Sequence, residues 1–204
     1  GMRERMILPA RKLHVSKTLA HEQLALVETL AIGCHAVERA AVNAGENVLI
    51  IGAGPIGLSA LEFVKVAGAT CIVMDMNEAR LAFCRERMGV AHTIVARGDG
   101  AELDALRALT NGQLADVVID ATGSAKSMAQ ALNYAAFGGR VVFVGITAQE
   151  ISFPQAPAMH RRELTLLGSR NALARDFARI IALIEDGRID TGPWITHRAP
   201  FDEM

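Results

Sequence analysis

The feature that most constrains the fold is a glycine-rich loop between a predicted strand and a predicted helix. Residues 47–51, NVLII, form a short apolar run of the kind that is buried on both faces of a parallel sheet. The next six residues, GAGPIG, fit the pattern G-x-G-x-x-G, and residues 58–67 carry apolar side chains at helical spacing. This order predicts a phosphate-binding turn at the start of a βαβ unit.

Each glycine of the loop has its own expected role. Gly52 makes the tight turn, Gly54 lets the backbone approach a pyrophosphate, and Gly57 allows the helix to pack against the strand. Pro55 suits the start of a helix, where no N–H partner is needed. Free N–H groups and the positive end of the helix dipole favour an anion here. The motif alone is equally compatible with a plain tight turn.

An acidic residue ends the next predicted strand. Residues 70–74, TCIVM, lead into Asp75, at about the 20-residue distance where a carboxylate accepts hydrogen bonds from an adenosine ribose. Such a carboxylate bonds to a free 2′-hydroxyl and repels a 2′-phosphate, so Asp75 favours NAD over NADP. Arg80 argues the other way, because an arginine can pair with a phosphate. The alternative is that the glycines serve only close packing and Asp75 only caps the next helix.

The composition fits one substantial α/β domain. The chain has 204 residues, 51% of them hydrophobic, and 18 glycines. A net charge of −1 makes nucleic acid and anionic membranes poor partners. We find no signal peptide and no apolar run long enough to cross a bilayer, and the three cysteines share no metal-type spacing. We therefore expect a cytoplasmic protein with reduced thiols.

Strands and helices are expected to alternate along the rest of the chain. Further helices are expected over 20–42, 77–88, 101–109, 124–136 and 171–185, and further strands over 92–95, 116–120, 140–145, 151–153, 163–168 and 195–196. The first of these helices is either continuous or broken near Gly33. Right-handed crossovers then predict a doubly wound, six-stranded parallel sheet of order 3-2-1-4-5-6, with ligand between strands 1 and 4.

Several motifs together resemble the medium-chain zinc-dependent alcohol and polyol dehydrogenases. They cover nearly the whole chain and are LVETLAIGCHAVERA, GENVLIIGAGPIGLSALEFVKVAGA, DMNEARL, DVVIDATG, GGRVVFVGI, ELTLLGSR and DGRIDTGPWITHRAPF. The first is most similar to the sorbitol, threonine and sugar-acid dehydrogenase branch. The resemblance implies NAD-linked hydride transfer from a small polyol, sugar acid or related secondary alcohol. It also implies a homodimer joined through a sheet edge, for which 151–153 is the expected strand.

The resemblance also implies which residues contact the cofactor. These are Gly52, Gly54, Pro55, Ile56, Gly57, Asp75, Met76, Arg80, Thr122, Val144, Gly145 and Ile146. In the family pattern, Asp75 and Arg80 match contacts to the adenosine ribose and Thr122 a position beside the adenine. Ile56 matches a residue behind the nicotinamide ring, and 144–146 the strand end near its amide. The nucleotide-binding domain is expected over 45–190.

The resemblance assigns no catalytic residue to this chain. Family members begin with a separate catalytic domain that carries zinc ligands, and we expect residues 1–44 to be a remnant of the junction with it and 191–204 a tail toward a further segment. Glu28 matches a catalytic-zinc ligand or its close neighbour, although by itself it reads as a solvated helix carboxylate. His35 could touch ligand from the helix before the glycine-rich loop, but a packed or exposed helix histidine is the favoured interpretation. A catalytic zinc needs three protein ligands, so we expect this chain to bind no zinc.

We therefore expect the chain to bind NAD(H) and, alone, to turn over poorly or not at all. Three alternatives remain at this point. The chain could be a free-standing, non-catalytic NAD-binding module that acts as a sensor or partner subunit. It could be a zinc-free reductase of the same superfamily. It could also be a methyltransferase, since those enzymes use a similar glycine-rich loop for a different adenosyl ligand.

Overall fold

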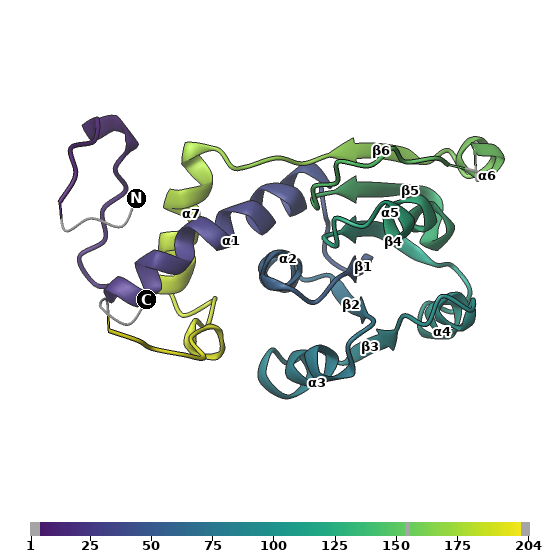
Figure 1. Ribbon diagram of the computed structural model, residues 1–204, viewed down its shortest axis with the longest axis horizontal. Helices are drawn as coiled ribbons and strands as arrows, with labels where there is room; N and C mark the ends of the chain where they lie inside the picture. Colours follow the sequence, from purple (N-terminus) through teal and green to yellow (C-terminus); the bar gives the residue numbers. More distant parts are fainter. Residues whose placement is uncertain (1–4, 154–155, 201–204) are drawn as a thin grey trace.

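The computed structural model describes residues 5–153 and 156–200 and is built around a parallel sheet of six strands (Figure 1). Neighbouring strands are hydrogen-bonded in the order β3-β2-β1-β4-β5-β6, and every pair is parallel. The strands are β1 (Asn47–Ile51), β2 (Thr70–Asp75), β3 (His92–Val95), β4 (Ala115–Asp120), β5 (Ala135–Phe143) and β6 (Thr165–Gly168). The predicted α/β class and strand order are confirmed.

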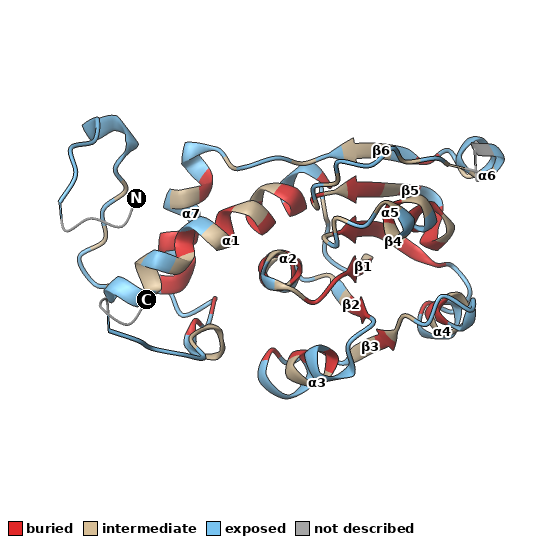
Figure 2. Ribbon diagram, viewed as in Figure 1, coloured by how far each residue is buried: buried red, intermediate tan, exposed pale blue. Residues whose placement is uncertain are grey.

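Helices cover both faces of this sheet. They are α1 (His21–Arg39), α2 (Pro55–Val66), α3 (Glu78–Arg87), α4 (Ala101–Leu109), α5 (Ala125–Ala131), α6 (Ala156–Arg161) and α7 (Ala174–Glu185), with 3-10 turns at Ala10–Lys12, Leu132–Tyr134 and Gly192–Trp194. One core cluster joins α1, α2, α3 and α7 to strand residues such as Ile50, and the second joins α4 and α5 to strand residues such as Leu49. Alternate residues of β1 thus face opposite helical layers, which explains its uninterrupted apolar sequence. The strand is drawn largely in the colour of buried residues (Figure 2).

Helix α1 is continuous through Gly33, which decides between the two alternatives left open for this segment. A Cβ atom at Gly33 would lie 2.3 Å from the backbone nitrogen of Ala60 on α2. Glycine is therefore present because α1 and α2 pack with their backbones in close approach, and not because the helix ends there.

Two predicted strands are wrong. Residues 151–153 form no strand, and Phe153 instead stacks on Phe143 of β5 with ring centroids 6.1 Å apart; Pro154, expected to end that strand, lies outside the described residues. The outer position beside β5 belongs to β6. Residues 195–196 are also irregular. At 151–153 a tertiary contact overrules a short alternating pattern, and residues 195–196 pair with no strand in the described part of the chain.

The segment from 124 to 145 also differs from prediction. The expected helix ends at Ala131 and is followed by a 3-10 turn, and β5 begins at Ala135 and runs through Gly138 and Gly139, where a turn was expected. The pairing of β5 with β4 shifts register between Ala115 and Val117. A bulge of this kind accommodates glycines within a strand, so Gly138 and Gly139 do not mark the start of β5. Helix α6 was not predicted.

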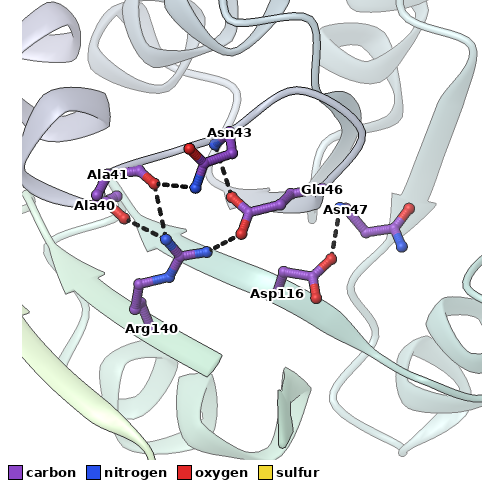
Figure 3. A network of polar contacts seen from close by, with 7 residues as sticks. All are labelled: Ala40, Ala41, Asn43, Glu46, Asn47, Asp116 and Arg140. Atoms are coloured by element: carbon purple, nitrogen blue, oxygen red, sulfur yellow. Dashed lines mark hydrogen bonds and ion pairs between the residues drawn. The ribbon is translucent and has the colours of Figure 1, made fainter. Parts of the chain in front are cut away.

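Arg140 ties the amino-terminal side of the sheet to the end of α1 (Figure 3). Its guanidinium donates hydrogen bonds to the carbonyl oxygens of Ala40 at 3.0 Å and Ala41 at 2.8 Å, and it pairs with the Glu46 carboxylate. Glu46 in turn accepts the Asn43 N–H at 2.8 Å. This network closes the last turn of α1 at the opposite end of the strands from the glycine-rich loop.

Within the described ranges, no helix has the length and apolar character needed to cross a bilayer.

Candidate functional site

The glycine-rich loop joins β1 to α2, and its conformation demands a glycine at Gly52 and Gly57, whereas Gly54 is open to its surroundings. Gly52 has φ +99°, a conformation that disfavours any side chain. A Cβ at Gly57 would lie 1.8 Å from the Gly52 carbonyl oxygen, so only glycine allows this packing. At Gly54 a Cβ would meet nothing within 4 Å, so the surface beside the loop backbone is open. Pro55 is the first residue of α2, as expected.

Asp75 is turned toward this loop. Its Oδ2 accepts the Ala53 N–H at 2.7 Å, and its Oδ1 accepts the Asn77 N–H at 2.8 Å. The Arg80 guanidinium lies 3.8 Å from Oδ2. The cap of α3 is Asn77, whose side chain accepts the N–H groups of Ala79 and Arg80. Asp75 is therefore not the side chain that caps this helix, and it joins the end of β2 to the glycine-rich loop.

Two cavities open at the carboxyl ends of the strands. The larger has a volume of about 720 Å³ and is lined by Ile56 and by the segment 143–147 that ends β5. The smaller has a volume of about 260 Å³ and is lined by Gly52, Asp75 and Met76. Thr122, which follows β4, lines both. The two cavities thus lie on either side of the crevice between β1 and β4, where doubly wound sheets bind ligands.

Thr122 is held in place by a buried carboxylate. Asp120 is fully buried at the end of β4, and its Oδ1 accepts both the Thr122 N–H at 2.9 Å and the Thr122 hydroxyl at 2.7 Å. Its Oδ2 accepts the Ser127 hydroxyl at 2.5 Å. A Cβ at Gly145 would lie 2.3 Å from the Gly123 nitrogen, so the loops after β4 and β5 touch through their backbones. This contact brings the predicted residues 144–146 beside Thr122.

Most of the predicted cofactor contacts line one of the two cavities or both. Ile56, Thr122, Val144, Gly145 and Ile146 line the larger cavity, and Gly52, Asp75, Met76 and Thr122 line the smaller one. The other predicted contacts, which line neither cavity, are Gly54, Pro55, Gly57 and Arg80. Gly54 and Pro55 lie at the start of α2, and the Arg80 guanidinium on α3 lies beside the Asp75 carboxylate. The predicted contacts thus gather at the carboxyl ends of the strands.

Sequence reasoning missed several residues that line the cavities. Ser169, Arg170 and Asn171 line the larger one directly after β6, and the smaller one is also lined by Arg97, Glu102, Lys126, Gln130 and Tyr134. Arg97 and 169–171 could have been found, because each follows the carboxyl end of a predicted strand. Glu102 and Tyr134 gave no such signal, since they belong to α4 and to the 3-10 turn at Leu132–Tyr134 and do not follow the end of a strand.

The described residues do not fit a zinc ion. Among them, no three His, Cys, Asp or Glu side chains gather as metal ligands would. Glu28 is exposed on α1 and lines neither cavity. His35 packs between α1 and α7 with its Nδ1 3.4 Å from the buried Asp176 carboxylate, and it also lines neither cavity. The described part of the chain therefore supplies no complete set of zinc ligands.

The three cysteines are held as neutral thiols. Burial raises the pKa of Cys34 from 9.0 to about 11, with Asp176 and Glu38 acting in the same direction and Arg179 opposing them. Burial likewise raises the pKa of Cys84 to about 11 and that of Cys71 further still. Thiols of this kind are poor nucleophiles, so none is a candidate for covalent catalysis.

The model of one protein family matches residues 55–186, and its description is "Zinc-binding dehydrogenase". L-galactonate-5-dehydrogenase of Escherichia coli K12 is 40% identical over 203 residues, which are 98% of this chain and 58% of that protein. L-arabinitol 4-dehydrogenase of Hypocrea jecorina is 35% identical over 199 residues, which are 96% of this chain and 52% of that protein. The chain therefore spans about half the length of the curated relatives it matches.

Solved structures show the same fold. The crystal structure of ECK1772 from Escherichia coli, described as an oxidoreductase/dehydrogenase of unknown specificity involved in membrane biogenesis, superposes with a TM-score of 0.77. It is 32% identical to this chain, and the alignment covers 84% of this chain and 48% of that one.

Proposed function

Since the chain belongs to the zinc-binding dehydrogenase family, in its polyol and sugar-acid branch, we propose that it forms the NAD-binding part of a dehydrogenase that oxidises a polyol or related secondary alcohol. Relatives named as dehydrogenases of L-galactonate and L-arabinitol support this substrate class. NAD would supply the chemistry by accepting a hydride at its nicotinamide ring. The single observation that carries the proposal is that the Asp75 carboxylate and the open glycine-rich loop face the same surface.

Each part of the site suits one part of the cofactor. We assign the diphosphate to the loop at Gly54, where free N–H groups of the first turn of α2 would bind it. The smaller cavity beside Asp75 is assigned to adenosine, and the larger one beside Ile56 to the nicotinamide half. Met76 and Thr122 would contact the adenine, and 144–146 the nicotinamide amide. The roles of the chain's own residues are thus to bind and orient the dinucleotide.

The choice of NAD over NADP rests on Asp75. A 2′-phosphate would bring a second negative charge against its buried carboxylate, whereas a 2′-hydroxyl can donate to it. Arg80 is 3.8 Å from this carboxylate and partly balances its charge. It is therefore less free to pair with a phosphate than an isolated arginine would be.

The assembly and the catalytic metal stay proposals as well. Glu28 would contribute to a zinc site only with ligands from outside the described residues, so we expect this chain alone to bind NAD(H) without efficient turnover.

The division into 1–44, 45–190 and 191–204 is also kept as a proposal, although α1, which lies before residue 45, packs against α2 and α7 of the central segment. A homodimer would form through an outer strand, for which β6 now replaces 151–153. A purely monomeric sedimentation profile would contradict that dimer.

Calorimetry with NAD, NADP and S-adenosylmethionine tests the cofactor assignment, and a Gly54→Val variant makes the test specific. Gly54 has φ −81° and open space beside it, so valine fits the folded chain but occupies the place assigned to the diphosphate. Gly168→Val is the matched control, since a Cβ there also meets nothing within 4 Å. We expect the wild type and the control to bind NAD, and Gly54→Val to lose binding. Wild-type preference for S-adenosylmethionine, or full NAD binding by Gly54→Val, would overturn the assignment.

A further inference from the structure

A buried carboxyl oxygen without a partner lies at the smaller cavity. Glu102, in the first turn of α4, lines this cavity and is 7% exposed. Its Oε2 is buried and has no hydrogen-bond partner within the part of the chain that the structure describes. A buried polar atom of this kind costs free energy unless something donates a hydrogen bond to it. Glu102 therefore has an acceptor position that the chain's own contacts do not use.

The other oxygen of Glu102 is held only loosely. The Tyr134 hydroxyl donates to Oε1 at 3.4 Å, which is longer than the usual range for O–H···O bonds. Burial raises the pKa of Tyr134 to about 12, and the charge of Glu102 and its hydrogen bond act in the same direction. The phenol thus keeps its proton and is the donor. Because the terminal torsion of a glutamate is broad, the carboxyl group can turn and present Oε2 to the cavity.

Glu102 is the better placed of the two acids that line this cavity to accept a new hydrogen bond. Both oxygens of Asp75, the other acid, already accept backbone N–H groups, from Ala53 and Asn77. Lys126 and Arg97, which also line the cavity, can only donate. Among the charged side chains that the structure places along this cavity, Glu102 alone therefore offers an acceptor oxygen without a partner, and it matches a ligand group that donates a hydrogen bond.

We propose that Glu102 accepts a hydrogen bond from the exocyclic amine of adenine and so makes the site selective for the adenine base. The inference rests on the proposed function, which assigns this cavity to adenosine. It adds a specificity residue that none of the sequence motifs contains. A base with a carbonyl oxygen in place of the amine would set two acceptors against each other, which a buried site rejects strongly.

The test compares NAD with nicotinamide hypoxanthine dinucleotide, which carries such a carbonyl, by calorimetry on the whole chain. We expect the wild type to bind the analogue about tenfold more weakly than NAD, as for one lost hydrogen bond in a buried site. In Glu102→Gln the side-chain amide can donate to the carbonyl, so the ratio of the two affinities falls toward one. Glu86→Gln, an exposed acid on α3, is the matched control and keeps the wild-type ratio.

Equal wild-type affinity for the two dinucleotides would overturn the inference without any variant, and so would a ratio in Glu102→Gln equal to that of the wild type. If Glu102→Gln does not fold, Glu102→Ala tests the same point, because it removes both carboxyl oxygens and so should also bring the ratio of the two affinities toward one. A wild-type chain that binds neither dinucleotide would contradict the proposed function and the inference with it. If only the inference is wrong, the wild type still binds NAD but shows no preference for adenine over hypoxanthine.

Discussion

The Gly33 N–H donates a hydrogen bond at 3.0 Å to the hydroxyl of Ser59, which in turn donates to the Leu30 carbonyl oxygen at 2.9 Å. This fully buried serine thus joins α2 to the middle of α1. The contact requires a glycine on α1, because a Cβ at Gly33 would lie 2.3 Å from the Ser59 hydroxyl oxygen. The glycine-rich loop begins α2, so the same packing holds the start of the binding site in place.

Gly33→Ala should destabilise the chain. Alanine has a helix propensity about 1 kcal/mol better than glycine, so without a clash this substitution would stabilise the protein. The added methyl group would clash with the backbone of α2, and overpacking of this kind costs about 1–3 kcal/mol or more. We expect a lower urea midpoint, with Gly168→Ala as the open-space control. A midpoint at or above that of the wild type would show that the helices separate easily.

Asp75→Asn should change both stability and cofactor choice. Asparagine has one acceptor oxygen for the two N–H groups, of Ala53 and Asn77, that Asp75 now satisfies, so about 1–3 kcal/mol of stability should be lost. The preference for NAD over NADP should shrink, because the negative charge facing the 2′ position is gone. Calorimetry with both cofactors measures this, with the exposed Asp104→Asn as control. If the variant kept the wild-type preference for NAD over NADP, the ribose 2′ position would not lie beside Asp75.

Arg140→Met should lower stability without affecting dinucleotide binding. The substitution removes hydrogen bonds to the Ala40 and Ala41 carbonyl oxygens and leaves the half-buried Glu46 without its cation. Bonds to charged groups contribute about 1.5–3 kcal/mol each in proteins, so the urea midpoint should fall clearly. NAD affinity should stay within twofold or so of the wild type, since the network lies at the opposite end of the strands. Loss of binding in a folded variant would contradict this separation.

The thiols predict a loss of stability at alkaline pH. The pKa of Cys34 and that of Cys84 are each raised by burial to about 11 in the folded chain, above the value of 9.0 for a free thiol. Their contribution is therefore complete below about pH 9 and is lost as the pH rises toward 11, since the unfolded chain ionises first. Urea midpoints measured at a series of pH values should fall across this interval.

Alkylation provides an independent check of the same pKa shifts. At pH 8 iodoacetamide should label Cys34 and Cys84 of the folded chain far more slowly than the same cysteines in urea, because the folded thiols stay protonated and buried. Labelling at equal rates in the two states would contradict the raised pKa values.

The order of strands could be predicted because it depends on patterns that are local in the chain. An apolar run such as NVLII specifies a buried strand by itself, and the glycines that follow specify the turn into α2. The handedness of βαβ connections then leaves few arrangements, so the sheet and the position of its ligand crevice followed without any contact being known. Asp75 was found in the same way, by its distance from the loop.

Other features depend on which residues meet across the folded chain. The sequence leaves open whether the first helix breaks near Gly33, and only the packing of α2 against α1 explains this glycine. Phe153 is predicted to belong to a strand and instead stacks on Phe143. The contact between Glu102 and Tyr134 joins residues 32 positions apart, on two segments whose sequences carry no common motif. Backbone propensity acts over a few neighbouring residues, whereas packing and burial act between residues brought together only by folding. Local patterns therefore specified the scaffold and its glycine-rich loop, and folding alone placed the side chains that complete the cavity.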